Sequence, residues 1–88
     1  MSALMAVKKI AGRTFSYEKF AKVIERLFEN GFVNVNGAIN QLADYTGYKA
    51  WLQIEEFEDN NGHKVTLEFV KESVNGHVYY HIRSVEVS

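Results

Sequence analysis

Asparagine–glycine pairs divide this chain into short elements. Four of its six glycines follow an asparagine, and the chain contains no proline. Asn and Gly both tolerate a positive φ, so these pairs mark helix ends and tight reversals. No Gly- and Ser-rich linker interrupts the chain, and we expect a single compact domain over residues 1–88. The four pairs are Asn30-Gly31, Asn36-Gly37, Asn61-Gly62 and Asn75-Gly76.

The composition is that of a folded protein. Apolar residues make up 47% of the chain and aromatic residues 14%, which argues against disorder. The absence of cysteine excludes disulfides, thiolate metal sites and cysteine nucleophiles. No apolar run approaches the roughly 18–20 residues of a membrane span, and no signal-peptide core is present. We therefore expect a cytoplasmic protein that has no cofactor and does not contact a membrane.

Residues 17–30 carry the strongest helix signal. Apolar side chains recur there at helical spacing, while charged side chains fill the opposite face. Ser16 stands at the N-cap position, Phe15 and Phe20 at the positions of a hydrophobic staple, and Gly31 at C′. The pattern predicts an amphipathic helix with one buried stripe.

Two shorter segments also have helical patterns. Residues 3–11 fit a helix that Ser2 caps and Gly12 ends, although their β-branched residues also fit a strand. Residues 37–46 fit a helix that begins after Asn36. The N-terminal half is therefore expected to contain two or three helices.

The C-terminal half is typical of an antiparallel meander. If Asn61-Gly62 and Asn75-Gly76 form two-residue type I′ turns, Asn60 faces His63 and Val74 faces His77. We therefore predict an α+β fold, with two or three N-terminal helices packed on a three-stranded antiparallel β-meander. The predicted strands span residues 49–58, 64–73 and 78–87.

This register assigns the strand side chains to two faces. Ile54 lies opposite Phe69 on the face that helix 17–30 is expected to cover. A one-residue slip would exchange the faces, so the assignment depends on the two turns. The expected core face consists of Ala50, Leu52, Ile54, Val65, Leu67, Phe69, Val78, Tyr80 and Ile82.

Metal and catalytic chemistry find little support in the sequence. Three histidines, His63, His77 and His81, are scattered, and no cysteine accompanies them. Ser84 has the opposite strand parity to His81 and Glu68, so a Ser-His-acid set would be split by the sheet. We expect no metal site and no enzymatic activity.

The second face of the sheet indicates protein binding. Aromatic anchors among polar and charged groups are typical of a protein–protein patch, unless the N-terminal helix folds over them. The hypothesis is an adaptor or small inhibitor, monomeric or homodimeric, that occupies a surface of a larger macromolecule. The acidic stretch 55–59 suits a basic, nucleic-acid-binding surface of the partner. The candidate binding residues are Trp51, Phe57, Tyr79, His81 and Arg83.

Nucleic-acid binding is the alternative hypothesis. Residues 1–26 hold six basic residues against two acidic ones, and a basic helical end suits phosphates. Residues 41–48, with Ala43 and Gly47 four apart, resemble the first helix and turn of a helix-turn-helix. The strand-like alternation of residues 52–54 does not continue that motif. The candidate phosphate-binding residues are Lys8, Lys9, Arg13, Lys19, Lys22 and Arg26.

Overall fold

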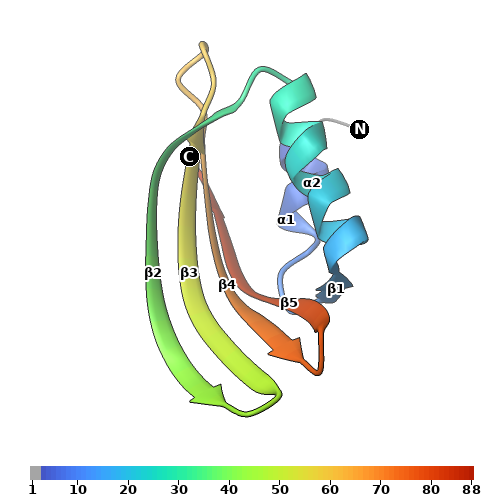
Figure 1. The fold of residues 1–88 in the computed structure, drawn as a ribbon. Helices are drawn as coiled ribbons and strands as arrows, with labels where there is room; N and C mark the ends of the chain where they lie inside the picture. The colour runs from blue at the N-terminus through green and yellow to red at the C-terminus, as the bar shows by residue number, and fades with distance from the viewer. Residues whose placement is uncertain (1–2) are drawn as a thin grey trace.

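A curved five-stranded sheet carries two helices on its concave side (Figure 1), in a computed structural model that describes residues 3–88. The strand order is β1-β5-β4-β3-β2, and all neighbouring strands are antiparallel. β1 and β2 are therefore the two edges of the sheet. The elements are α1 (Ala3–Lys8), β1 (Thr14–Ser16), α2 (Tyr17–Glu29), β2 (Val33–Tyr45), β3 (Tyr48–Glu58), β4 (Lys64–Val74) and β5 (His77–Val87).

The predicted fold class was wrong. The three expected strands form as β3, β4 and β5, but two further strands flank them, and the described chain has two helices. Residues 37–46, expected as a helix, instead form most of β2 and the start of its turn. Ile39, Leu42 and Ala43 imitate helical spacing because a register irregularity at Leu42 breaks the strand alternation. Residues 41–48 therefore form the end of β2, the following turn and the first residue of β3, and not the first helix and turn of a helix-turn-helix.

Helix α2 begins and ends as its sequence predicts. The Ser16 hydroxyl accepts a hydrogen bond from the backbone N–H of Lys19 at 3.4 Å. At the other end, the N–H groups of Gly31 and Phe32 donate to the carbonyls of Phe28 and Leu27. This is a Schellman arrangement, in which Gly31 supplies the positive φ of 86°.

Helix α1 forms, so the strand alternative for this segment is not adopted. It ends at Lys8, earlier than the predicted Ala11, and a turn follows. Val7 and Ile10 are buried, which fixes this segment on the core. Ser2, the predicted N-cap, lies outside the described residues.

The β4–β5 turn is the predicted two-residue turn. Asn75 and Gly76 both have positive φ, 49° and 85°, and Val74 pairs with His77. Both values suit a type I′ turn. The Asn75 N–H also donates to the carbonyl of Gly47 at 2.7 Å, which ties this turn to the β2–β3 turn.

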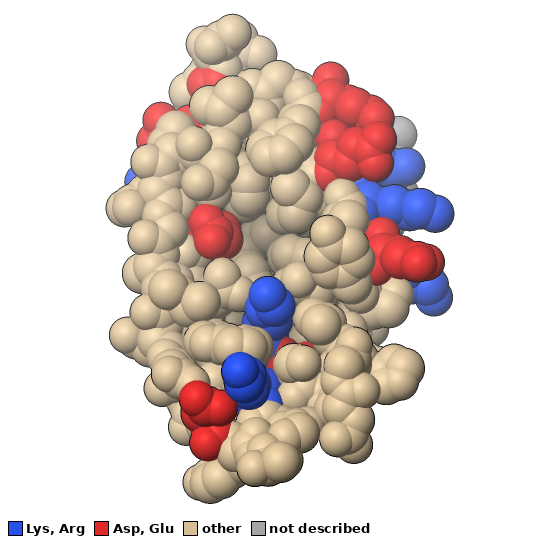
Figure 2. Space-filling model, viewed as in Figure 1, with Lys and Arg blue, Asp and Glu red and all other residues tan. Residues whose placement is uncertain are grey.

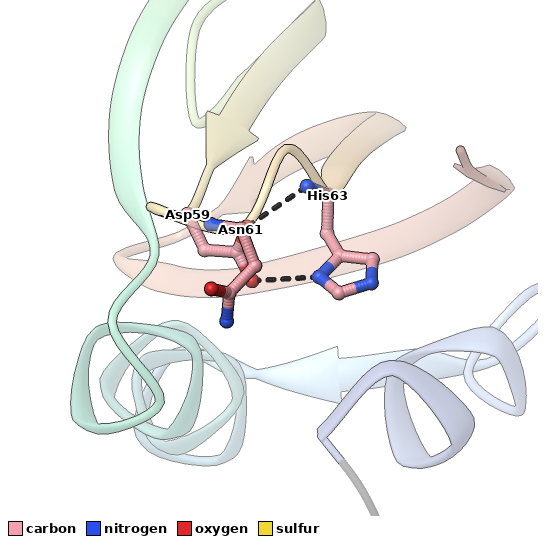
Figure 3. Close-up of polar contacts among 3 residues, drawn as sticks. All are labelled: Asp59, Asn61 and His63. Carbon is pink, nitrogen blue, oxygen red and sulfur yellow. Dashed lines mark hydrogen bonds and ion pairs between the residues drawn. The ribbon is translucent and has the colours of Figure 1, made fainter.

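The β3–β4 turn is one residue longer than predicted. The Asp59 N–H donates to the His63 carbonyl, so the loop holds residues 60–62. Asp59 Oδ1 accepts the N–H groups of Asn61 and His63 at 2.9 and 2.8 Å, and Oδ2 lies 2.9 Å from His63 Nδ1 (Figure 3). A side chain that satisfies two turn amides favours this longer loop, which Gly62 closes at φ 82°.

The longer turn exchanges the two faces of β3 relative to the prediction. Gln53, and not Ile54, lies opposite Phe69, and Phe57 lies opposite Val65. Phe57 therefore faces the helices and is 2% exposed. Three residues assigned to the core face, Ala50, Leu52 and Ile54, lie on the convex face instead.

The core lies between the helices and strands β4 and β5. The ring of Phe20 stacks on Tyr80, with centroids 4.2 Å apart, and contacts Phe69 at 4.9 Å. Leu27, from the same helix face, is 1% exposed. Burial of these side chains, at about 25 cal/mol per Å² of apolar surface, is the main stabilising contribution. The remaining buried apolar residues include Val7, Phe32, Val65, Leu67 and Ile82.

Candidate binding surface at the open edge of the sheet

Strand β2 is a long edge strand with an unusual lack of charge. It spans 13 residues, and its first 11 contain no charged side chain. Edge strands in soluble proteins are usually short, charged or covered, because their free N–H and C=O groups pair with other chains. The strand has five large apolar side chains that are exposed, at 47 to 70% exposure: Val33, Val35, Ile39, Leu42 and Tyr45.

Two bulges leave a regular segment in the middle of β2. The pairing with β3 shifts at Val35 and again at Leu42, and residues 36–41 pair without interruption between them. Bulges bend and twist an edge locally. The six-residue segment of unbroken register between them is about the length that an added strand needs to form a regular ladder.

A groove runs beside this segment on the concave side of the sheet. The two helices cover β4, β5 and the Phe57 end of β3, and they leave the concave side of β2 and of the rest of β3 open (Figure 1). Figure 2 shows the hollow between the sheet edge and the helices, with charged groups on its walls. The groove has a volume of about 370 Å³ and is lined by Phe20, Ile24, Phe28, Asn34, Gln53, Glu55, Phe57, Phe69, Lys71 and Tyr80.

The polar wall of the groove is organised by Asn34 and Glu55. Asn34 Nδ2 donates to Glu55 Oε2 at 2.9 Å and lies 3.3 Å from the Glu56 carbonyl. Lys71, also in the groove, places its Nζ 5.4 Å from the centre of the Trp51 ring. Among residues 3–88, no Lys, Arg or His forms an ion pair with Glu55.

The five predicted protein-binding residues do not form one patch. Trp51 and Phe57 face the helix side, and Phe57 is part of the core. Tyr79 and His81 lie on the convex face, because their neighbours Tyr80 and Ile82 point into the core. Arg83 is exposed at the register shift between β4 and β5. The predicted face was therefore wrong for Trp51 and Phe57, because the β3–β4 turn is one residue longer than expected, and it was right for Tyr79 and His81.

The convex face carries a chain of polar contacts that crosses four strands. Thr14 Oγ1 lies 2.9 Å from His81 Nδ1, and His81 Nε2 lies 3.2 Å from Glu72 Oε1. The Tyr48 hydroxyl donates to Glu72 Oε2 at 2.9 Å. Hydrogen bonds from Tyr48 and then His81 lower the pKa of Glu72, and the Glu72 carboxylate raises the pKa of Tyr48. A hydroxyl, an imidazole and a carboxylate stand in series here, which is the order of groups in a hydrolytic triad.

Ser84 lies on the same face as Glu68, so its predicted parity was wrong. The register shift at Arg83 turns Ser84 to that face, and the Ser84 hydroxyl donates a hydrogen bond to Glu68 Oε2 at 3.3 Å. Within the described chain, no three His, Asp or Glu side chains gather as metal ligands would. The helices of this same part of the chain are all too short or too polar to cross a membrane.

The six predicted phosphate-binding residues are all exposed on the helical side of the molecule. They come from α1, the segment after it, and α2. Acidic groups lie among the basic ones on this side (Figure 2). Lys22 and Arg26 also line a hollow of about 230 Å³ between the two helices, with Val7, Ile10 and Leu27 at its floor.

Sequence reasoning missed the residues of β2 that line the open edge. The available signal was the alternating Val33-Asn34-Val35-Asn36 and the uncharged stretch that follows it. Comparisons with protein-family models, with curated proteins and with solved structures find no match to this chain.

Proposed function

We propose that this chain is a non-catalytic protein-binding module, an adaptor or small inhibitor that holds an extended segment of another protein along β2. The observation that supports the proposal is the uncharged, exposed edge strand beside an open groove. Main-chain hydrogen bonds to the edge would provide affinity, and side chains in the groove would provide specificity. The cytoplasmic location expected from the sequence stays a prediction.

A lysine on the edge strand tests the proposal. Natural proteins block strand pairing with lysine at sheet edges, and Ile39 is 59% exposed, so Ile39→Lys should fold normally. We would select binders from a displayed library of random nine-residue peptides. Ile39→Lys should weaken binding of the selected peptides at least about tenfold, which corresponds to about 1.4 kcal/mol.

Tyr79→Lys is the matched control, because Tyr79 is also an exposed apolar residue of a strand but lies away from the edge. It should bind the selected peptides as the wild type does. Equal binding by the wild type and Ile39→Lys would refute the proposed use of β2.

The exposure of all six basic residues on the helical side supports nucleic-acid binding as a second candidate function. Phosphate contacts release counterions, so binding to labelled duplex or single-stranded oligonucleotides should fall steeply between 50 and 200 mM salt, by about 10³-fold for six contacts. Fluorescence anisotropy at two salt concentrations measures this. Absence of binding at the lower concentration would remove this candidate.

A further inference from the structure

The missing side chain of Gly37 in the edge strand exposes the carboxylate of Glu55 to any segment that pairs with β2. Five of the six glycines in the described chain have positive φ, and Gly37 is the exception. Its backbone therefore does not require glycine. A Cβ at this position would lie 2.6 Å from Glu55 Oε2, so the missing side chain leaves the space that the Glu55 carboxylate occupies.

Glu55 consequently extends over β2 toward the free edge. Gly37 and Glu55 are directly paired across β2 and β3, and neighbouring strands are about 4.8 Å apart. The carboxylate spans that distance and reaches the strand at the edge of the sheet. The hydrogen bond from Asn34 Nδ2 holds it there.

The carboxylate has no cation from its own chain within residues 3–88. The basic residue among those that line the groove, Lys71, lies over the ring of Trp51. Lys64 is paired with Glu56, at 3.4 Å. A half-buried carboxylate without a cation favours a positively charged ligand, because opposite charges attract each other more strongly near a protein surface than in open water.

We propose that β2 accepts an extended segment of a partner protein that places Lys or Arg opposite Gly37 and an apolar residue opposite Ile39. Side chains directly opposite one another lie about 4.5–5.5 Å apart and point to the same face. Gly37 and Ile39 share the concave face, because their partners Glu55 and Gln53 both line the groove. The recognised sequence is therefore a basic and an apolar residue separated by one position.

A second copy of this chain is a poorer occupant of the edge. Its own β2 contains no Lys or Arg, and its single charged residue is Asp44. Pairing of two β2 strands would therefore leave both Glu55 carboxylates without a cation. The inference rests on the proposed function, to which it adds the chemistry of the partner.

The experiment compares peptides selected from the same nine-residue library by the wild type, Glu55→Gln and Glu56→Gln. Gln keeps the shape of Glu55 and an oxygen that accepts from Asn34, but it removes the charge. Glu56→Gln is the matched control, since it makes the same change on the neighbouring residue, whose side chain lies on the opposite face of the sheet. Wild type and Glu56→Gln should enrich Lys or Arg, two positions from an apolar residue, about fivefold over the library, and Glu55→Gln should not.

The outcomes separate this inference from the proposed function. The inference is overturned if Glu55→Gln enriches basic residues as much as the wild type does, or if the wild type does not enrich them. In either case, selected peptides that bind the wild type and not Ile39→Lys would still support the use of β2. Failure of all variants to select any peptide that depends on Ile39 overturns both. A wild-type protein that dimerises through β2 in sedimentation equilibrium also overturns the inference.

Discussion

Glycine serves two different purposes in this molecule. Gly47 has a φ of 77°, which side chains rarely adopt, and a Cβ there would lie 2.5 Å from Asn75 Oδ1. Gly37 has an ordinary strand conformation and leaves space for the end of a flexible side chain. The first glycine is required by the fold, and the second is explained by access to Glu55.

Substitution by alanine should change the free energy of unfolding in opposite directions at these two positions. Gly37→Ala should raise the free energy of unfolding by about 0.5 kcal/mol, because alanine is less flexible than glycine in the unfolded chain, and should abolish the preference for basic peptides. Gly47→Ala should lower the free energy of unfolding by about 1–2 kcal/mol, because alanine is unfavourable at positive φ. Urea unfolding measures both. Destabilisation by Gly37→Ala of more than 1 kcal/mol would mean that the position of Glu55 is structural.

Trp51 and Phe57 were predicted as equivalent anchors, and the structure separates them. Phe57→Ala should cost about 3–5 kcal/mol of stability, because the side chain is 2% exposed in the core. Trp51→Ala should leave a folded protein and weaken binding of the selected peptides by about 2 kcal/mol, since Trp51 pairs directly with Gln41 of the edge strand. Thermal unfolding and peptide anisotropy distinguish the two. Unfolding of the Trp51 variant would show that Trp51 is a core residue.

Asp59 should make stability depend on pH. Partial burial opposes ionisation of its carboxylate, but the hydrogen bonds from His63 and Asn61 outweigh this and lower its pKa below 3.8. A lowered pKa in the folded state stabilises the protein above the unfolded pKa, and that stability is lost as the pH falls through the folded value. When the pH is lowered from about 5 to about 3, the melting temperature of the wild type should therefore fall more than that of Asp59→Asn. Parallel losses in the two proteins would contradict this role.

Helices and strands with strong local signals were predicted correctly, and those with weak signals were not. Helix α2 was predicted because its caps and its buried stripe are all local. Strand β2 was not, because both of its faces are largely exposed and the bulges at Val35 and Leu42 remove the alternation that marks a strand. The faces of β3 depended on a single turn, and the carboxylate of Asp59 selected a loop that the Asn61-Gly62 pair alone does not indicate. The candidate site lies on β2 and β3, so it could not be predicted without the strand and the faces that were missed.

Hydrogen exchange should rank the strands by their position in the sheet. Amides of β4, the central strand of the five, should exchange slowest, and the outward amides of β2 fastest. Addition of a selected peptide should slow exchange at residues 36–41 and leave β1 unchanged. Slowed exchange confined to the helices would place the peptide elsewhere.

The sheet is wider than the helical layer that covers it. The helices rest on one half, and the β2–β3 hairpin extends the molecule to 44 Å along its longest axis, against 22 and 19 Å across (Figure 1). The exposed half has the geometry of a two-layer fold that lacks part of one layer. A partner segment would therefore add to an existing sheet and need no rearrangement of the core.

The lack of basic residues on β2 predicts a monomer. Sedimentation equilibrium from 5 to 200 μM should give a mass near 10.1 kDa throughout, because two copies paired through β2 would each keep an unpaired Glu55. Ile39→Lys provides the control, since it blocks the edge. A mass that rises with concentration in the wild type alone would show self-pairing through this strand.

The hydrogen bond between the Asn75 N–H and the Gly47 carbonyl also bears on the speed of recognition. It joins the tips of the two hairpins, so the long arm that carries β2 does not swing independently of the rest of the sheet. No ordering step on this side then precedes the encounter, and the observed association rate should rise linearly with peptide concentration, at about 10⁵–10⁷ M⁻¹s⁻¹. Differences in affinity between peptide sequences should consequently appear in how long each complex survives.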